Sequence, residues 1–384
     1  MKNDQSPIPD VKLAITVPAQ EVNHNNAAQT QTQSPQGSAS DGRQFPNLSM
    51  ARAILVVVVI SIAALLTALN SQSIVIILLE LGNAMAIPSS RQWLVVSIYS
   101  ISTGSVMLLW GRLADVYGRR LGFLSVSAIF TLSTMCLPWS TYEIPFYVLR
   151  AVQGMSAAAI MPSGIGIVAS TFALGPSRNM PFITMSAMAS LSSVVGSLLG
   201  GFVGTSLGWK WVFWIPAVVS ACTTATGFFV TAGHTIRAAT QGPTEDIEGS
   251  KKPYVDWIGG GLVWSSLTLV LVSITQGNVS SWATPWIPLL LVISVLLLAG
   301  FIFYQCRSEK DPNRLPLMRM SRFQKKQVSA LFVLVGCFYV SFNGLLVFVT
   351  YFYQKYQGPS ELQTTLRFLP AGISGCEYIS VIGA

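Results

Sequence analysis

The sequence is dominated by long apolar runs that contain almost no charged side chains. Windows of about 19 residues find ten runs, near 53–79, 93–111, 121–140, 144–173, 182–206, 210–232, 257–276, 285–304, 328–353 and 364–384. Only 10% of the 384 residues are charged, against about 25% in soluble proteins. About 20 apolar residues suffice to cross a bilayer as a helix. The sequence therefore predicts an all-α polytopic membrane protein.

The first run is longer than a bilayer requires. Its 27 residues would form a helix about 40 Å long, whereas the hydrocarbon core is about 30 Å thick. The polar stretch ALNSQS at 68–73 interrupts it, so we expect the helix to tilt, protrude or break. Polar side chains at membrane depth usually face a cavity or another helix, and this makes Asn70 and Gln72 candidates for a central site.

The positive charges are distributed asymmetrically between the two sides of the predicted membrane. Of the 23 Lys and Arg residues, 18 lie in alternate segments that share one side with the amino terminus, four lie on the other side, and Arg150 lies within a run. Positive residues gather on the cytoplasmic side, so the amino terminus is expected inside the cell. Because the net charge of +8 is spread over these loops, it does not predict nucleic-acid binding.

The polar segments divide the chain into six parts. We expect a disordered cytoplasmic tail rich in Gln, Asn and Ser, and two cytoplasmic linkers that enclose a pair of helices. The predicted parts are the tail at 1–50, a six-helix bundle at 51–232, a linker at 233–256, a two-helix hairpin at 257–304, a basic linker at 305–327, and the first two helices of an incomplete bundle at 328–384.

The sequence offers no pattern typical of an enzyme. Its two histidines, His24 and His234, fall in the tail and a linker, and the five cysteines lack metal-ligand spacing. We find neither a nucleophile elbow nor a phosphate-binding loop. We therefore expect no catalytic residues, no metal and no cofactor.

Charged residues gather in the loop between the second and third runs, GRLADVYGRR at 111–120. The two glycines allow tight backbone geometry near helix ends. The carboxylate could pair with the neighbouring arginines or approach the positive end of a nearby helix. A plain positive-inside loop is the alternative. The candidate residues are Gly111, Arg112, Asp115, Gly118, Arg119 and Arg120.

Arg150 is the one clear charge within a run, about 9 Å from the start of its predicted helix. Two interpretations remain open. The side chain could extend to the membrane surface, or it could face an internal cavity together with Gln153, which lies one turn away on the same face.

Glycines recur at intervals of four in the fifth run, at Gly196, Gly200 and Gly204, with Gly201 beside them. Small residues at this spacing let two helices approach closely. Close packing explains the pattern without any further function.

Three motifs in this order resemble those of the major facilitator superfamily. GRLADVYGRR is similar to the loop signature of that family, RAVQG at 150–154 is similar to its fourth-span motif, and GSLLGGFVGTSLGWKWVFWI at 196–215 is similar to the glycine-rich motif of its antiporters. The likeness covers everything after residue 50. The additional hairpin resembles the fourteen-span drug:proton antiporters, especially the fungal ones.

The resemblance implies two six-helix bundles that rock around a central cavity. Asp115 would then help to latch the bundles in one state, and Arg150 with Gln153 would act in substrate or proton coupling. The first helix of the second bundle would line the cavity through Tyr339 and Asn343. The helix-packing residues would limit proton leak, and these are Gly154, Gly196, Gly200, Gly201 and Gly204.

The chain departs from the family pattern in three ways. The family has Gly-Pro before the closing glycines of the fifth span, whereas this motif has no proline. The region of Asn70 is neutral where many antiporters carry an acid. The chain also stops at Ala384, within the tenth run, where the family continues through four more spans.

The sequence and the resemblance together predict proton-coupled export of a drug-like compound or a secondary metabolite. The expected partners are the substrate, protons and the lipid bilayer, with no oligomer required. The plasma membrane is the expected location, followed by the vacuolar membrane. One alternative is a transporter of a small inorganic solute such as ammonium or borate, and another is a truncated chain that does not transport.

Overall fold

A computed structural model describes residues 50–172, 176–240, 255–280, 282–311, 316–318 and 320–352. The described residues contain helices and no strand. The elements are α1 (Met50–Ala84), α2 (Ser89–Tyr117), α3 (Arg119–Cys136), η1 (Leu137–Trp139), α4 (Glu143–Thr171), α5 (Pro176–Leu198), η2 (Leu199–Val203), α6 (Gly204–Leu207), α7 (Trp211–Thr240), α8 (Trp257–Ser280), α9 (Trp286–Lys310), η3 (Met320–Gln324) and α10 (Lys326–Phe352). The predicted tail and the tenth run, 364–384, lie outside the described residues, apart from Met50.

Eight of the described helical segments are long and apolar enough to cross a membrane. They correspond to the first eight predicted runs, and the segment Lys326–Ser341 in α10 is a shorter apolar helix. The protein is therefore an all-α, multi-pass integral membrane protein, as the sequence predicts. Helices α7 and α9 continue to Thr240 and Lys310, so each extends into a segment that was expected to be a linker.

Helix α1 runs without a break through the polar stretch at 68–73. Of the three outcomes expected for this run, tilting, protrusion or a break, the break is wrong, because Asn70 and Ser73 are buried against neighbouring helices and α1 continues. The Asn70 side chain also donates a hydrogen bond to the Leu66 carbonyl within the same helix, at 3.1 Å.

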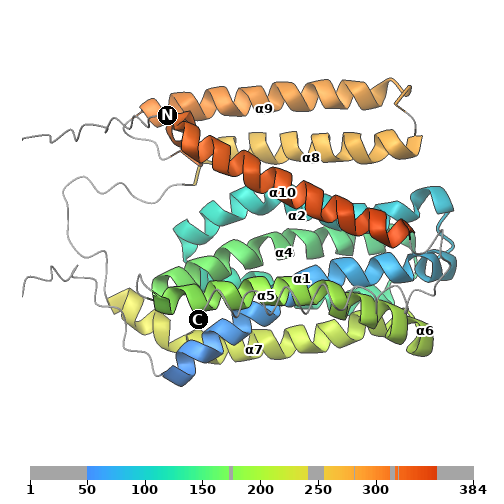
Figure 1. Cartoon of the computed structure of the whole chain (residues 1–384), viewed down its shortest axis with the longest axis horizontal. Helices are drawn as coiled ribbons and strands as arrows, with labels where there is room; N and C mark the ends of the chain where they lie inside the picture. The colour runs from blue at the N-terminus through green and yellow to red at the C-terminus, as the bar shows by residue number, and fades with distance from the viewer. Residues whose placement is uncertain are drawn as a thin grey trace, which may run out of the picture. The chain divides into compact units, whose positions relative to one another are not determined.

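The helices α1 to α7 pack against one another as a bundle. Helix α4 lies against α2 and α3, α1 lies against α5 and α7, and α3 lies against α7; several of these neighbours are visible in Figure 1. Two apolar clusters of buried side chains stabilise this arrangement. One includes Ile60, Phe123 and Val168, and the other includes Leu81 and Phe213.

Helices α8 and α9 form the predicted hairpin and lie side by side (Figure 1). The Ser266 hydroxyl of α8 donates to the Ser294 carbonyl of α9 at 3.0 Å. Helix α8 also packs on α2, where a Cβ added to Gly260 would lie 2.5 Å from a methyl carbon of Leu109. The hairpin is therefore anchored to the bundle through α2.

Candidate functional site

Arg150 lies inside the bundle with none of its surface exposed. Helix α4 carries it toward α2, where its Nε donates to the Val95 carbonyl at 3.4 Å. Its guanidinium carbon lies 4.5 Å from the centre of the Tyr99 ring, within the range of a cation–π contact. The interpretation in which Arg150 extends to the membrane surface is therefore wrong, because the side chain is bound to groups of a neighbouring helix.

Gln153 connects Arg150 to two more helices. Its Oε1 accepts a hydrogen bond from Arg150 Nη1 at 2.5 Å. Its Nε2 donates to Thr134 Oγ1 of α3 at 2.7 Å and to Asn70 Oδ1 of α1 at 3.3 Å. All four side chains are fully buried. The structure thus unites three predicted candidates, Asn70, Arg150 and Gln153, in one polar cluster.

Two members of this cluster were not predicted from the sequence. Thr134 accepts from Gln153, and Tyr99 lies beneath the guanidinium while its hydroxyl donates to the Thr67 carbonyl at 2.8 Å. A hydroxyl residue in an apolar run is common, because it can bond to its own helix, as Thr134 does with the Phe130 carbonyl at 2.6 Å. Only the packing of α2 and α3 on α4 distinguishes these two residues from other Ser, Thr and Tyr residues.

The guanidinium of Arg150 retains one unsatisfied donor. Its Nη2 is buried and has no hydrogen-bond partner within the described residues. The ion pairs recorded in the same part of the chain join Arg91 with Glu143 and Arg119 with Asp115. The contacts recorded for Arg150 are with the Val95 carbonyl, the Gln153 amide and the Tyr99 ring. This arrangement can stabilise a positive charge and can offer a donor to an acceptor that enters the bundle.

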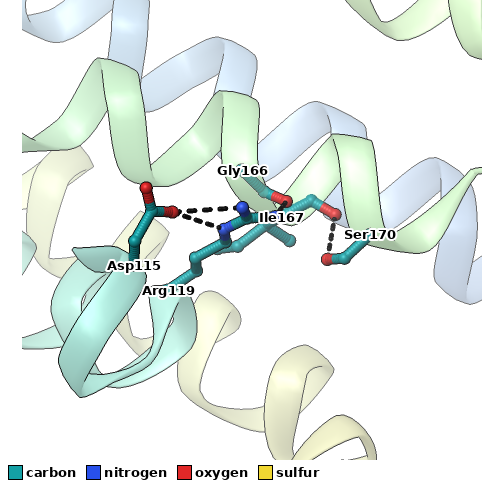
Figure 2. Close-up of polar contacts among 5 residues, drawn as sticks. All are labelled: Asp115, Arg119, Gly166, Ile167 and Ser170. Carbon is teal, nitrogen blue, oxygen red and sulfur yellow. Dashed lines mark hydrogen bonds and ion pairs between the residues drawn. The ribbon is translucent and has the colours of Figure 1, made fainter. Parts of the chain in front are cut away.

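The charged loop motif, GRLADVYGRR at 111–120, brings the end of α2 and the start of α3 into contact with α4 (Figure 2). Asp115 Oδ1 accepts from Arg119 Nε at 3.2 Å and from Nη2 at 3.1 Å. Arg119 Nη1 donates to the Gly166 carbonyl of α4 at 3.0 Å. Asp115 therefore pairs within its own loop, and Arg119 ties that pair to α4.

Gly166 was not singled out in the sequence, although its lack of a side chain makes this contact possible. A Cβ at position 166 would lie 2.5 Å from Arg119 Cδ and 2.8 Å from its Nε. The glycine therefore leaves the space that the arginine occupies. The glycine is visible in the stretch PSGIG at 162–166. Its role could not be predicted, because the side chain that it accommodates, Arg119, lies 47 residues away in the sequence.

The remaining loop residues differ in their roles. Gly118 joins α2 to α3 with φ of +98°, which other L-residues rarely adopt, so its predicted role near a helix end agrees with the backbone. Gly111 lies within α2, and a Cβ there would be 3.9 Å from Pro162; the expected tight backbone geometry is absent there, because the helix continues to Tyr117. Arg112 and Arg120 are half-buried, and the Arg112 Nε is buried with no hydrogen-bond partner among the residues that the structure describes.

Glycines bring two pairs of helices into close contact. A Cβ on Gly154 of α4 would lie 2.6 Å from the Tyr99 carbonyl oxygen of α2. On α5 and the following segment, Gly196, Gly200 and Gly204 lie against α1, and a Cβ at Gly200 would be 2.6 Å from the Ser73 carbonyl oxygen. Gly201 takes no part in this approach, since a Cβ there would have nothing within 4 Å. The interval of four places the other three on one face.

Within the described residues, three predicted site residues, Gln72, Tyr339 and Asn343, make no recorded contact with the polar cluster. Gln72 is half-buried on α1, and its Cβ lies 3.0 Å from the position that a Cβ added to Gly196 would take. Tyr339 is 61% exposed on α10. Asn343 lies in α10, and its side chain is outside the described residues. A search of the described residues finds no cluster of His, Cys, Asp and Glu that could hold a metal.

Comparison with known proteins gives a family and several relatives. Residues 60–383 match the Major Facilitator Superfamily. An efflux pump, terJ, of Aspergillus terreus is 26% identical over 85% of this chain. The low affinity ammonium transporter of Saccharomyces cerevisiae and the puromycin resistance protein pur8 of Streptomyces alboniger are each 27% identical over 77% of it.

The matched region covers 62%, 56% and 55% of those three relatives, so the chain spans somewhat more than half of their length. The family match nevertheless extends over most of this chain, and it includes most of α1 and all of helices α2 to α10. The motifs, the helical fold and this match agree, and the chain belongs to the Major Facilitator Superfamily.

Proposed function

We propose that the protein moves a small organic compound out of the cytoplasm by alternating access, with protons as the coupling ion. The observation that carries this proposal is the buried Arg150, whose Nη2 has no partner within the described residues. An arginine within a membrane-spanning helix costs about 2.5–3.5 kcal/mol on insertion scales. A fold that retains such a residue, held by side chains from four helices, is expected to use it.

The cluster has the properties expected of a coupling site. In alternating access, two groups of helices rock about a central binding site. Arg150 touches α2 through the Val95 carbonyl and reaches α1 and α3 through Gln153. Because α1 to α4 belong to one bundle, rocking would move Arg150 together with these partners, and it would change which groups outside the bundle its Nη2 can reach. The relatives named as an efflux pump and a resistance protein support export as the direction.

The loop motif is proposed to act as a latch between two conformations. Asp115 and Arg119 are both partly exposed, so their ion pair contributes only about 0.2–1 kcal/mol to stability. A contact of this size can shift a balance between two conformers without holding the fold together. The glycines at 154, 196, 200 and 204 are proposed to keep the bundle tight enough to limit proton leak. The excess of Lys and Arg supports a cytoplasmic amino terminus, and the plasma membrane is the proposed location.

A small inorganic solute is the second candidate for the cargo. Asn70, the residue of α1 in the polar cluster, is neutral, which suits an uncharged solute such as boric acid, whereas any cation, organic or ammonium, would be better stabilised by a carboxylate. One relative is named as a low affinity ammonium transporter. This candidate predicts transport of ammonium or borate and indifference to larger compounds.

Everted membrane vesicles that contain the protein test both candidates. The assay follows uptake of methylammonium and of a panel of apolar drug-like compounds, each with and without an imposed pH gradient. Uptake of at least one organic compound that collapses with the gradient is the expected result. Uptake of methylammonium alone, above the passive accumulation in vesicles that lack the protein, would select the second candidate. Uptake that ignores the pH gradient would contradict proton coupling.

A further inference from the structure

The connection between α9 and α10 combines a strong positive charge with a fixed position. Segment 305–327 contains seven Lys and Arg residues and two acidic residues, Glu309 and Asp311, which gives a net charge of +5. Five of the cations are exposed on described residues, and these are Arg307, Lys310, Arg322, Lys325 and Lys326. Arg314 and Arg319 lie outside the described residues. Because α9 and α10 are consecutive, we expect the five described cations to share one side of the membrane.

Hydrogen bonds hold this connection against the end of α9. The Met318 amide donates to Gln305 Oε1 at 3.5 Å, and Gln305 is fully buried. Gln305 in turn donates to Asp256 Oδ2 at 2.8 Å, at the start of α8. Gln305 precedes the last residue of α9 by five positions, or about 7.5 Å along the helix. The chain therefore turns back toward the membrane after it leaves α9.

The short helix η3 is fixed on both of its sides. The Ser321 amide donates to Glu309 Oε2 at 3.1 Å, and the Ser321 hydroxyl also bonds to Glu309. On the other side, the Ser329 hydroxyl of α10 donates to the Phe323 carbonyl at 2.6 Å. The Phe323 ring lies 5.2 Å from the ring of Phe332. Glu309 is thus engaged with η3, and the cations around it remain exposed.

We propose that this basic surface, formed by the end of α9, η3 and the start of α10, binds the headgroups of anionic phospholipids. The positive-inside rule accounts for basic residues in such a connection, but it does not require the connection to fold back along a helix. The fold-back holds η3 beside the last turns of α9 and the start of α10, so we expect Arg322, Lys325 and Lys326 to lie close to the headgroups. The phosphodiester and carboxylate groups of an anionic lipid complement these cations, whereas a zwitterionic lipid carries no net charge.

The test measures the lipids that remain on the purified 384-residue protein after incubation in bicelles of equimolar phosphatidylserine and phosphatidylcholine. Each Lys or Arg near an anionic surface strengthens binding by about fivefold. We therefore expect phosphatidylserine to be enriched over phosphatidylcholine at least about fivefold at low salt. The enrichment should be lost near 1 M salt, where charges more than about 3 Å apart are screened from one another. Equal retention of the two lipids would overturn the proposal.

Two sets of variants localise the binding. The triple variant Arg322→Gln, Lys325→Gln, Lys326→Gln should lose the enrichment, and the pair Arg307→Gln, Lys310→Gln should lower it. The matched control removes three positive charges from the other linker, through Arg237→Gln, Lys251→Gln and Lys252→Gln, and should retain the enrichment. An equal loss in the control would show that net charge alone is responsible and would overturn the proposal.

Two further measurements complete the test. Unchanged thermal unfolding of each variant in detergent should show that the fold is retained. Millimolar inorganic phosphate should not displace the bound phosphatidylserine. Displacement by phosphate would indicate a site for small anions in place of a lipid surface and would contradict the proposal.

Discussion

Arg119 lies across Gly166 of a neighbouring helix, with its Nη1 donating to the Gly166 carbonyl at 3.0 Å and its Cδ 2.5 Å from where a Cβ of residue 166 would be. The same guanidinium pairs with Asp115 (Figure 2). This contact attaches the charged loop to α4, the helix that also carries Arg150. The proposed latch and the polar cluster therefore share one helix.

The substitution Gly166→Ala should detach the loop from α4. The added methyl group displaces the Arg119 side chain, which is flexible enough to move, so the protein should still fold. Amide hydrogen exchange in the peptide covering 111–122 should increase, because local opening exposes its backbone. The control Gly201→Ala, at a position with nothing within 4 Å of the new Cβ, should leave exchange unchanged. Unaltered exchange in Gly166→Ala would contradict the attachment.

The substitution Asp115→Asn should lower transport while leaving membrane insertion intact. It removes the negative charge that faces Arg119, and this pair is partly exposed, so stability should change by less than about 1 kcal/mol. The measurement is substrate flux normalised to the amount of protein in the membrane. If normalised flux stays at the unsubstituted level, Asp115 has no latch function.

The substitution Gly200→Ala should destabilise the bundle. Its Cβ would lie 2.6 Å from the Ser73 carbonyl oxygen, and this backbone atom cannot move without separating α1 from η2. Overpacking of this kind typically costs about 1–3 kcal/mol, which should appear as a lower midpoint of thermal unfolding. The neighbour Gly201→Ala should change stability by no more than about 0.5 kcal/mol. Equal midpoints for the two variants would refute the close approach of these helices.

The helices and several of their contacts could be predicted from the sequence because their signals are local. The apolar runs predict where the membrane-spanning helices lie. Gly196, Gly200 and Gly204, at intervals of four, predict one closely packed helix face, which in the structure meets α1. Gln153 lies one turn from Arg150, so their contact follows from helical geometry alone. The hydrogen bond between them, at 2.5 Å, shows that the two side chains are in contact.

The partners from other helices could not be predicted in the same way. Whether Thr134 or another hydroxyl of α3 meets Gln153 depends on the rotation and depth of α3 against α4, which no local pattern specifies. The role of Gly166 was equally unpredictable, because it depends on the Arg119 side chain, which extends from α3 to α4. The polar residues at 68–73 suggested a broken helix, but neighbours that bury Asn70 and Ser73 allow the helix to continue.

We propose that Arg150 takes part in transport through its planar guanidinium. Lysine would keep the charge, but it cannot bond to the Val95 carbonyl and Gln153 at once while lying over the Tyr99 ring. A lost charge-assisted hydrogen bond costs about 1.5–3 kcal/mol, which corresponds to about a tenfold to hundredfold change in an equilibrium. The control Arg52→Lys changes an exposed arginine of α1.

The most direct measurement is proton-gradient-driven flux by Arg150→Lys in everted vesicles, normalised to protein abundance and compared with Arg52→Lys. We predict that flux falls at least about tenfold in Arg150→Lys and stays near the unsubstituted level in Arg52→Lys. Normal flux in Arg150→Lys would contradict the account and would leave Arg150 as a residue that only joins helices.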